Sequence, residues 1–148
     1  MKLLLVLALL LTMGAGLGSA PDASDLTGRL REALNAERDE HGLAHLDAAP
    51  ELREDGMQWA SEIAASRTLV HRTNDQLAGG APTGWRTVGE NLARTNEARA
   101  GEATRAIIGA FMRSPAHRAN VLGDFDRVDV AALPGDDGLV YVVVTFVA

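Results

Sequence analysis

Residues 111–122 read FMRSPAHRANVL, and this stretch contains the clearest signals for the end of one helix and the start of another in the chain. Apolar residues recur there and just before it at the spacing of one helical face: Ile107, Ile108, Phe111 and Met112. Ser114 followed by Pro115 is typical of a helix that ends while another begins, because serine caps helix starts and proline fits the first turn. The stretch therefore predicts two helices in close succession, the first over about residues 102–113.

His117 would lie one turn into the second of these helices. A histidine held just after a helix start points in a defined direction, which a metal ligand or a general base requires. The same position also suits a histidine that only caps or packs, the commoner role of an isolated histidine. This stretch alone leaves both roles open.

The N-terminal 20 residues have the composition of a secretory signal peptide. Lys2 precedes an apolar run over residues 3–11, which is too short to cross the hydrocarbon core of a membrane as a helix. Gly18 and Ala20 are small residues at the usual cleavage offsets. We therefore expect cleavage after Ala20, a mature domain over residues 21–148, secretion to the extracellular space and no stable membrane insertion afterwards.

Composition limits the partners and the means of stabilisation. The chain has 14 lysines and arginines against 20 acidic residues, a formal net charge of −6 at pH 7, and Lys2 is its only lysine. Such a surface offers little of the counterion release that drives phosphate binding, so no nucleic-acid partner is expected. The chain contains no cysteine, and its length suits one domain with a core held by packing alone. We expect a monomer.

A first helix is predicted from apolar residues at helical spacing: Leu26, Leu30, Ala33 and Leu34. Ser24 or Asp25 is expected to cap its start, and Gly42 to follow its end. Asn35 and Arg38 fall off the apolar stripe, so the simplest expectation is that both are exposed polar residues.

A second helix is predicted to begin at Pro50 and to run to about Arg67. Gly56 lies within it and costs helix stability, so close packing by a neighbouring element is a reason to keep it. The following residues 72–85 are rich in glycine, asparagine and aspartate, and we expect an irregular loop there.

Residues 88–93 form a short apolar segment interrupted by Glu90 and Asn91. A buried carboxylate needs compensating partners. Glu90 is therefore either exposed or directed into a cleft where arginine, histidine or a metal compensates its charge.

The C-terminal residues predict a β-hairpin. Val128, Val130 and Ala132 alternate with other residues, whereas residues 139–147 are almost continuously apolar, and a Pro-Gly-Asp-Asp-Gly turn separates the two segments. The last strand should therefore be central and covered on both faces. With the predicted helices, this hairpin implies an α+β fold: a three-layer α-β-α sandwich with the antiparallel hairpin in its central sheet. No repeat or second domain is evident.

Three motifs together resemble the CAP superfamily, also called SCP-like, which includes the cysteine-rich secretory proteins, antigen 5 and the plant pathogenesis-related group 1 proteins. Asn35-Ala36-Glu37-Arg38 is similar to the family's first-helix signature, and Gly89-Glu90-Asn91 to its Gly-Glu-Asn motif. Residues 114–122 are similar to the bacterial block Ser-Pro-Gly-His-Arg-Ala-Asn, with Ala116 in place of the glycine. Secreted bacterial members look most similar to this chain.

The resemblance implies an α-β-α sandwich with a cleft formed by His71, Glu90 and His117, with Asn91 and Ser114 beside them. In some members this cleft binds a divalent metal such as zinc, and here the metal ligands would be His71 and His117. Two neutral imidazoles can take two positions of a tetrahedral site. The fuller family site has a second glutamate where this chain has Ser114, so we expect zinc or another divalent cation to bind weakly.

Three functions are consistent with these residues. The first is a secreted binding module whose cleft takes a lipid-like or peptide-like ligand. The second is a metal-dependent hydrolase, a peptidase or esterase, in which a metal activates water and Glu90 acts as base. The third is a purely structural hydrogen-bonded network. Ser114 and His117 could share a helix face, but no acidic residue that would orient the histidine of a serine hydrolase can be named.

Overall fold

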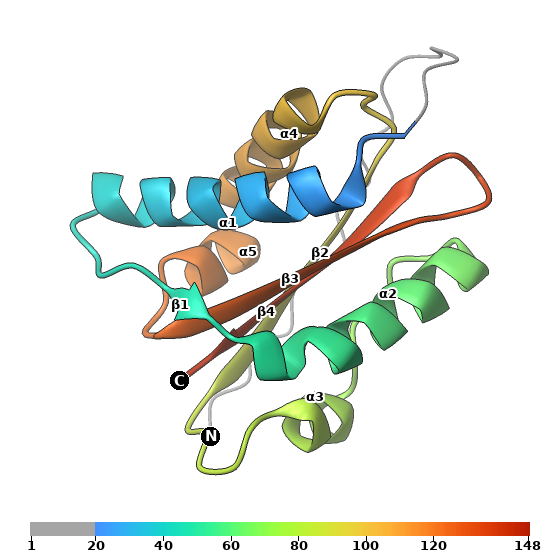
Figure 1. The fold of residues 1–148 in the computed structure, drawn as a ribbon. Helices are drawn as coiled ribbons and strands as arrows, with labels where there is room; N and C mark the ends of the chain where they lie inside the picture. The colour runs from blue at the N-terminus through green and yellow to red at the C-terminus, as the bar shows by residue number, and fades with distance from the viewer. Residues whose placement is uncertain (1–19) are drawn as a thin grey trace.

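The computed structural model describes residues 20–148, so the expected signal peptide lies outside the described residues except for Ala20. The elements in chain order are α1 (Ala23–Glu40), β1 (Asp47–Ala48), the 3-10 turn η1 (Pro50–Leu52), α2 (Arg53–Ser66), α3 (Asn74–Gly80), β2 (Val88–Thr95), α4 (Ala100–Arg113), α5 (Pro115–Val121), β3 (Arg127–Pro134) and β4 (Val140–Val147). Helices α1, α4 and α5 cover one face of the sheet and α2 and α3 the other (Figure 1). The predicted three-layer α-β-α sandwich is confirmed.

The sheet has the strand order β1-β3-β4-β2. The two C-terminal strands form the predicted antiparallel hairpin, with Val130 opposite Val144. Strand β4 lies between β3 and β2, and all its residues are buried, as its nearly continuous apolar sequence predicted. Strand β2 pairs antiparallel with β4 and is the outermost strand on that side within residues 20–148.

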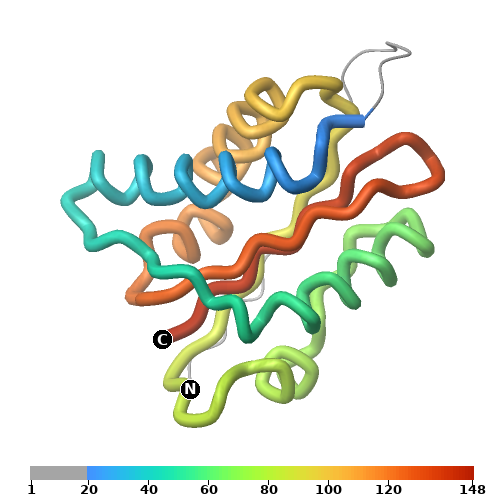
Figure 2. The backbone as a smooth tube through the Cα atoms, viewed as in Figure 1, coloured from blue at the N-terminus to red at the C-terminus, as the bar shows by residue number. Residues whose placement is uncertain are grey.

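Alternate residues of the strands supply two cores. On one face, Ala93, Val142 and Val144 pack with leucines of α1 and with apolar residues of α4. On the other, Leu92 and Val143 pack with α2 residues such as Ile63. The tube in Figure 2 shows the sheet running between the two helical layers. Successive side chains of a strand point to opposite faces of the sheet, so the same strands contribute apolar residues to both cores.

Helix α1 corrects two sequence predictions. Its N-cap is Asp22, not Ser24 or Asp25, because the Asp22 carboxylate accepts a hydrogen bond from the backbone N–H of Asp25 at 2.9 Å. Arg38 is buried and not exposed: its guanidinium donates to backbone carbonyls of a loop and of α5 and its exit. Asn35 is half-buried and exchanges hydrogen bonds with the backbone of Leu46.

The expectation of an irregular loop over residues 72–85 is wrong for its first half, which forms helix α3. Thr73 and Gln76 make a capping box, in which each side chain accepts from the backbone N–H of the other. This local pair stabilises the helix start despite the glycines that follow.

The close packing predicted at Gly56 is confirmed, since a Cβ there would lie 3.2 Å from the Ala131 side chain on β3. Across residues 20–148 no helix is both long and apolar enough to span a membrane.

Candidate functional site

His71 and Glu90 lie in contact on the α2 side of the sheet. His71 follows α2, and its Nδ1 lies 2.8 Å from Glu90 Oε1 on β2. A carboxylate only accepts, so His71 donates from Nδ1 and turns Nε2 away from Glu90. That Nε2 is buried and has no hydrogen-bond partner among the described residues. One imidazole nitrogen of His71 is therefore left without a partner in this part of the chain.

Arg72 accounts for the burial of the Glu90 carboxylate, which is 2% exposed. The backbone N–H of Arg72 donates to Glu90 Oε1 at 3.1 Å, and its Nε donates to Oε2 at 2.7 Å. The same guanidinium donates to Thr145 on β4 at 2.7 Å and pairs with Asp55 on α2. Both oxygens of Glu90 are therefore occupied, as a buried carboxylate requires.

His117 lies on α5 and is fully buried. Its ring centroid lies 5.2 Å from that of Phe111 and 6.5 Å from that of His71. Neither of its ring nitrogens has a hydrogen-bond partner among residues 20–148. Burial, and to a lesser degree the nearby His71, lowers the pKa of His117 from 6.5 to about 4. The ring is therefore neutral at physiological pH.

The two histidines approach each other across the edge of the sheet. Glu90 shares the face of β2 that carries Leu92, which packs on the α2 side, whereas Asn91 shares the face of Ala93 toward α4 and α5. His71 contacts Glu90, and the backbone C=O of His117 accepts from the Asn91 side chain at 3.1 Å. Because β2 is the edge strand, elements from both layers meet around it.

Asn91 and Asn120 fix α5 against β2. The Asn120 Nδ2 donates to Asn91 Oδ1 at 2.9 Å and to the backbone C=O of Glu90 at 3.1 Å. Gly89 lets α5 approach, since a Cβ there would lie 2.9 Å from Asn120 Oδ1. The predictions from sequence gave no role to Arg72 or Asn120, although each lies in or beside a motif that was identified.

Ser114 lies at the junction of α4 and α5, as predicted, and is the residue before Pro115 at the first turn of α5. It is half-exposed, and its side chain makes no capping hydrogen bond. Its backbone carbonyl instead accepts from Arg118 N–H at 2.8 Å. Among the hydrogen bonds of the described residues, none joins Ser114 to His71 or His117.

The donor set for a metal is small. Zinc sites in proteins usually have three or four protein ligands. Within the described part of the chain, no group of three or more histidine, cysteine, aspartate or glutamate side chains is arranged to hold an ion. Two imidazoles remain, since Arg72 and His71 already use the Glu90 oxygens. These residues do not make up the donor set of a typical zinc centre.

Comparison with known proteins identifies the family. Residues 31–146 match the family model described as CAP: Cysteine-rich secretory protein family. No curated protein matches the chain.

Several solved structures have the same fold. An outer surface protein from Borrelia burgdorferi superposes with a TM-score of 0.74 at 21% identity, over 88% of this chain and 98% of that one. An extracellular SCP-domain protein from Bacillus anthracis superposes with a TM-score of 0.68 at 17% identity, over 84% of this chain and 41% of that one. A cysteine-rich secretory protein from Staphylococcus aureus superposes with a TM-score of 0.68 at 21% identity, over 85% of this chain and 39% of that one.

At these identities the structures establish the fold, while the family model spans residues 31–146, a range that includes Glu90 and His117. The chain therefore belongs to the CAP family, the family of cysteine-rich secretory proteins, although it contains no cysteine.

Proposed function

We propose that this chain is a secreted, non-enzymatic binding module whose ligand, lipid-like or peptide-like, contacts the His71–His117 pair. The observation that carries the proposal is the set of three buried imidazole nitrogens without partners among the described residues: His71 Nε2 and both ring nitrogens of His117. Buried polar atoms without partners cost free energy, and a bound ligand would supply the partners that these three nitrogens need.

The contacts of Glu90 favour binding over hydrolysis. A general base must be able to reach the water that it activates. Here both carboxylate oxygens accept hydrogen bonds from His71 and Arg72. We infer that Glu90 orients His71 and neutralises Arg72. A divalent cation such as zinc would have only the two imidazoles as protein ligands, one fewer than catalytic zinc sites have.

Native mass spectrometry of the purified protein tests this function. We expect a bound small molecule in the wild type that is lost in His71→Ala and His117→Ala and kept in His45→Ala, an exposed control. Zinc titration of the same proteins should give weak or no binding. Glu90-dependent peptidase or esterase turnover, absent in Glu90→Gln, would overturn the binding proposal in favour of the hydrolase.

A further inference from the structure

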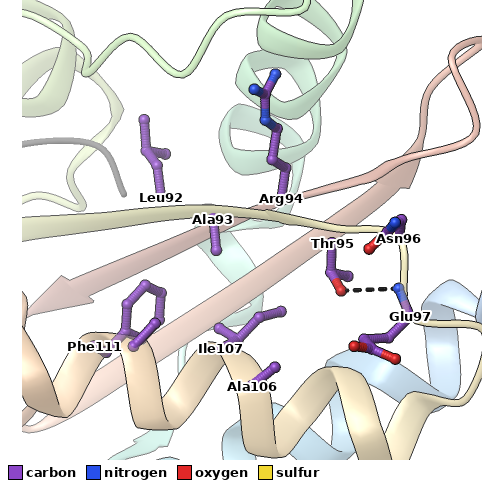
Figure 3. Close-up of a pocket in the computed structure, with 10 residues that line it drawn as sticks. Leu92, Ala93, Arg94, Thr95, Asn96, Glu97, Ala106, Ile107 and Phe111 are labelled. Atoms are coloured by element: carbon purple, nitrogen blue, oxygen red, sulfur yellow. Dashed lines mark hydrogen bonds between the residues drawn. The ribbon is translucent and has the colours of Figure 1, made fainter. Parts of the chain in front are cut away.

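The inner face of helix α4 is filled by its own packing. Figure 3 shows Ile107 and Phe111 pointing from α4 toward strand β2. The space left between the helix and the strand is about 20 Å³, which is room for about one water molecule. At the end of α4, Met112 is half-buried and Arg113 is exposed. A ligand of α4 would therefore have to bind on its outer side.

An open hollow lies on that outer side, where α4 meets α5, and its volume is about 410 Å³. The two helices are separated by the single residue Ser114, so they form an elbow (Figure 1). Met112 and Leu122 pack against the core of this layer and also line the hollow. The full lining consists of four apolar residues and two arginines: Met112, Arg113, Pro115, Arg118, Ala119 and Leu122. The hollow thus combines an apolar lining with two cationic side chains.

The elbow is basic in a chain that is acidic overall. Residues 99–122 contain four arginines and one acidic residue, Glu102, whereas the whole chain has a formal net charge of −6. Glu102 already pairs with Arg99 at 2.9 Å. Arg113 and Arg118, the two arginines of the hollow, are exposed and form no ion pair within the described part of the chain. Their charge is therefore available to an anionic partner.

Both arginines of the hollow have a defined position. Arg118 Nη2 donates to His41 Nε2 at 3.0 Å, and His41 Nδ1 in turn donates to the backbone C=O of Glu37 on α1 at 2.8 Å. The Arg113 side chain lies back along α4, since a Cβ on Gly109 would be 3.2 Å from its Nη1. Side chains that are already ordered lose less conformational entropy when a partner binds.

From these features we propose that the α4–α5 elbow docks an acidic segment of a partner protein. A large apolar side chain of that segment occupies the hollow, and carboxylates beside it pair with Arg113 and Arg118. Arginine can bind a carboxylate through two parallel hydrogen bonds, and charge complementarity fixes the register of the partner. Arginine and methionine are also residue types that are enriched in protein interfaces.

The combination of charge and shape favours a protein segment over other anions. A small inorganic anion would pair with the arginines but leave the apolar lining of the hollow in water. The surface of an anionic membrane is broad, so it would attract the arginines without filling a hollow. A segment that carries carboxylates around one apolar side chain satisfies both parts of the surface.

This surface is separate from the histidine pair and goes beyond the ligand proposed there. His117 is fully buried on α5, whereas Arg118 is exposed on the same helix, and neither His71 nor His117 lines the hollow. One short helix thus supplies a buried histidine to one site and outward residues to another.

Selection from a displayed library of random peptides on the purified domain tests the proposal. We expect enrichment of peptides in which aspartate or glutamate flanks leucine, isoleucine, methionine or phenylalanine. The affinity of a selected peptide, measured by fluorescence anisotropy, should fall as sodium chloride is added, because salt screens exposed charge pairs. No enrichment, or enriched peptides without acidic residues, would overturn the proposal.

Charge reversal locates the site on the elbow. Arg113→Glu should weaken a selected peptide by about tenfold, because an attraction becomes a repulsion. Replacing the acidic residues of the peptide by lysine should restore its binding to this variant. The control Arg67→Glu changes the net charge equally at an exposed position at the end of α2, in the other helical layer, and should leave binding intact. An equal loss in both variants would contradict docking at the elbow.

Further variants separate the hollow from the histidine pair, with circular dichroism to check that each is folded. Ala119→Phe should fill the hollow and abolish peptide binding, whereas Ala65→Phe on the exposed side of α2 should not. His71→Ala should keep the peptide and lose the ligand of the histidine pair, so the two proposals can fail independently. Retention on phosphatidylglycerol vesicles without any enriched peptide, or self-association that Arg113→Glu abolishes, would refute the acidic segment.

Discussion

Arg72 Nε lies 2.7 Å from Glu90 Oε2, and both side chains are almost fully buried. The same arginine contacts Asp55 and Thr145, so one guanidinium links α2, β2 and β4. His71 is oriented by the carboxylate that Arg72 holds. The position of His71 is thus a consequence of a buried ionic network.

Removing the arginine should destabilise the domain severely. In Arg72→Leu the Glu90 carboxylate stays buried without its cation, which costs about 3–5 kcal/mol of unfolding free energy in comparable cases. Urea denaturation followed by circular dichroism measures this. The control Arg99→Ala, which breaks an exposed pair with Glu102, should cost less than about 1 kcal/mol. Equal effects of the two changes would show that the network is not cooperative.

Stability should fall in acid because of His117. Its pKa is about 4 in the folded protein and near the ordinary 6.5 when unfolded, so the unfolded state binds the proton first. The stabilisation is complete above pH 6.5 and is lost as the pH falls toward 4, by a total on the order of 3 kcal/mol.

Denaturant midpoints measured across this pH range test the assignment. His117→Phe should flatten the dependence between pH 6.5 and 4, whereas His45→Gln, at an exposed position, should retain it. A wild-type midpoint that does not change over this range would show that His117 takes up its proton while folded.

Two glycine-to-alanine changes should act in opposite directions. Gly89→Ala places a Cβ 2.9 Å from Asn120 Oδ1 and from Phe125, so it should destabilise by about 1–3 kcal/mol. Gly28→Ala, within α1 and with no atom near the added carbon, should stabilise by about 0.5–1 kcal/mol. Thermal unfolding of both variants decides the point, and a tolerated Gly89→Ala would mean that α5 can shift away from β2.

Arg38 should be a structural residue despite its charge. It donates to the carbonyls of Ala44, Val121, Gly123 and Phe125, and Arg38→Met would leave these groups without their donor. We expect a loss of about 3 kcal/mol, given the strength of hydrogen bonds to charged groups. Arg29→Ala on the exposed side of α1 is the control and should be nearly neutral. A similarly small effect of Arg38→Met would show that water replaces the guanidinium.

Local patterns predicted the elements that depend on near neighbours. The apolar run of residues 139–147 predicted a central strand, because a strand covered on both faces must be apolar at every position. The Ser114-Pro115 pair predicted the break between α4 and α5. Helix α3 was not predicted. Its capping box stabilises the helix whereas its glycines destabilise it, and composition does not show which effect is larger.

The sequence by itself determined the layers, the hairpin and the family motifs, since these follow from period and local chemistry. The tertiary structure decided which polar residues are buried. The helical pattern predicts an exposed Arg38, whereas a loop and α5 cover it in the fold. No local pattern predicts the burial of Arg72, which depends on Glu90 and Asp55 from other elements. Partners far apart in sequence set the energy of a buried charge, so only the folded chain shows where a charge is compensated.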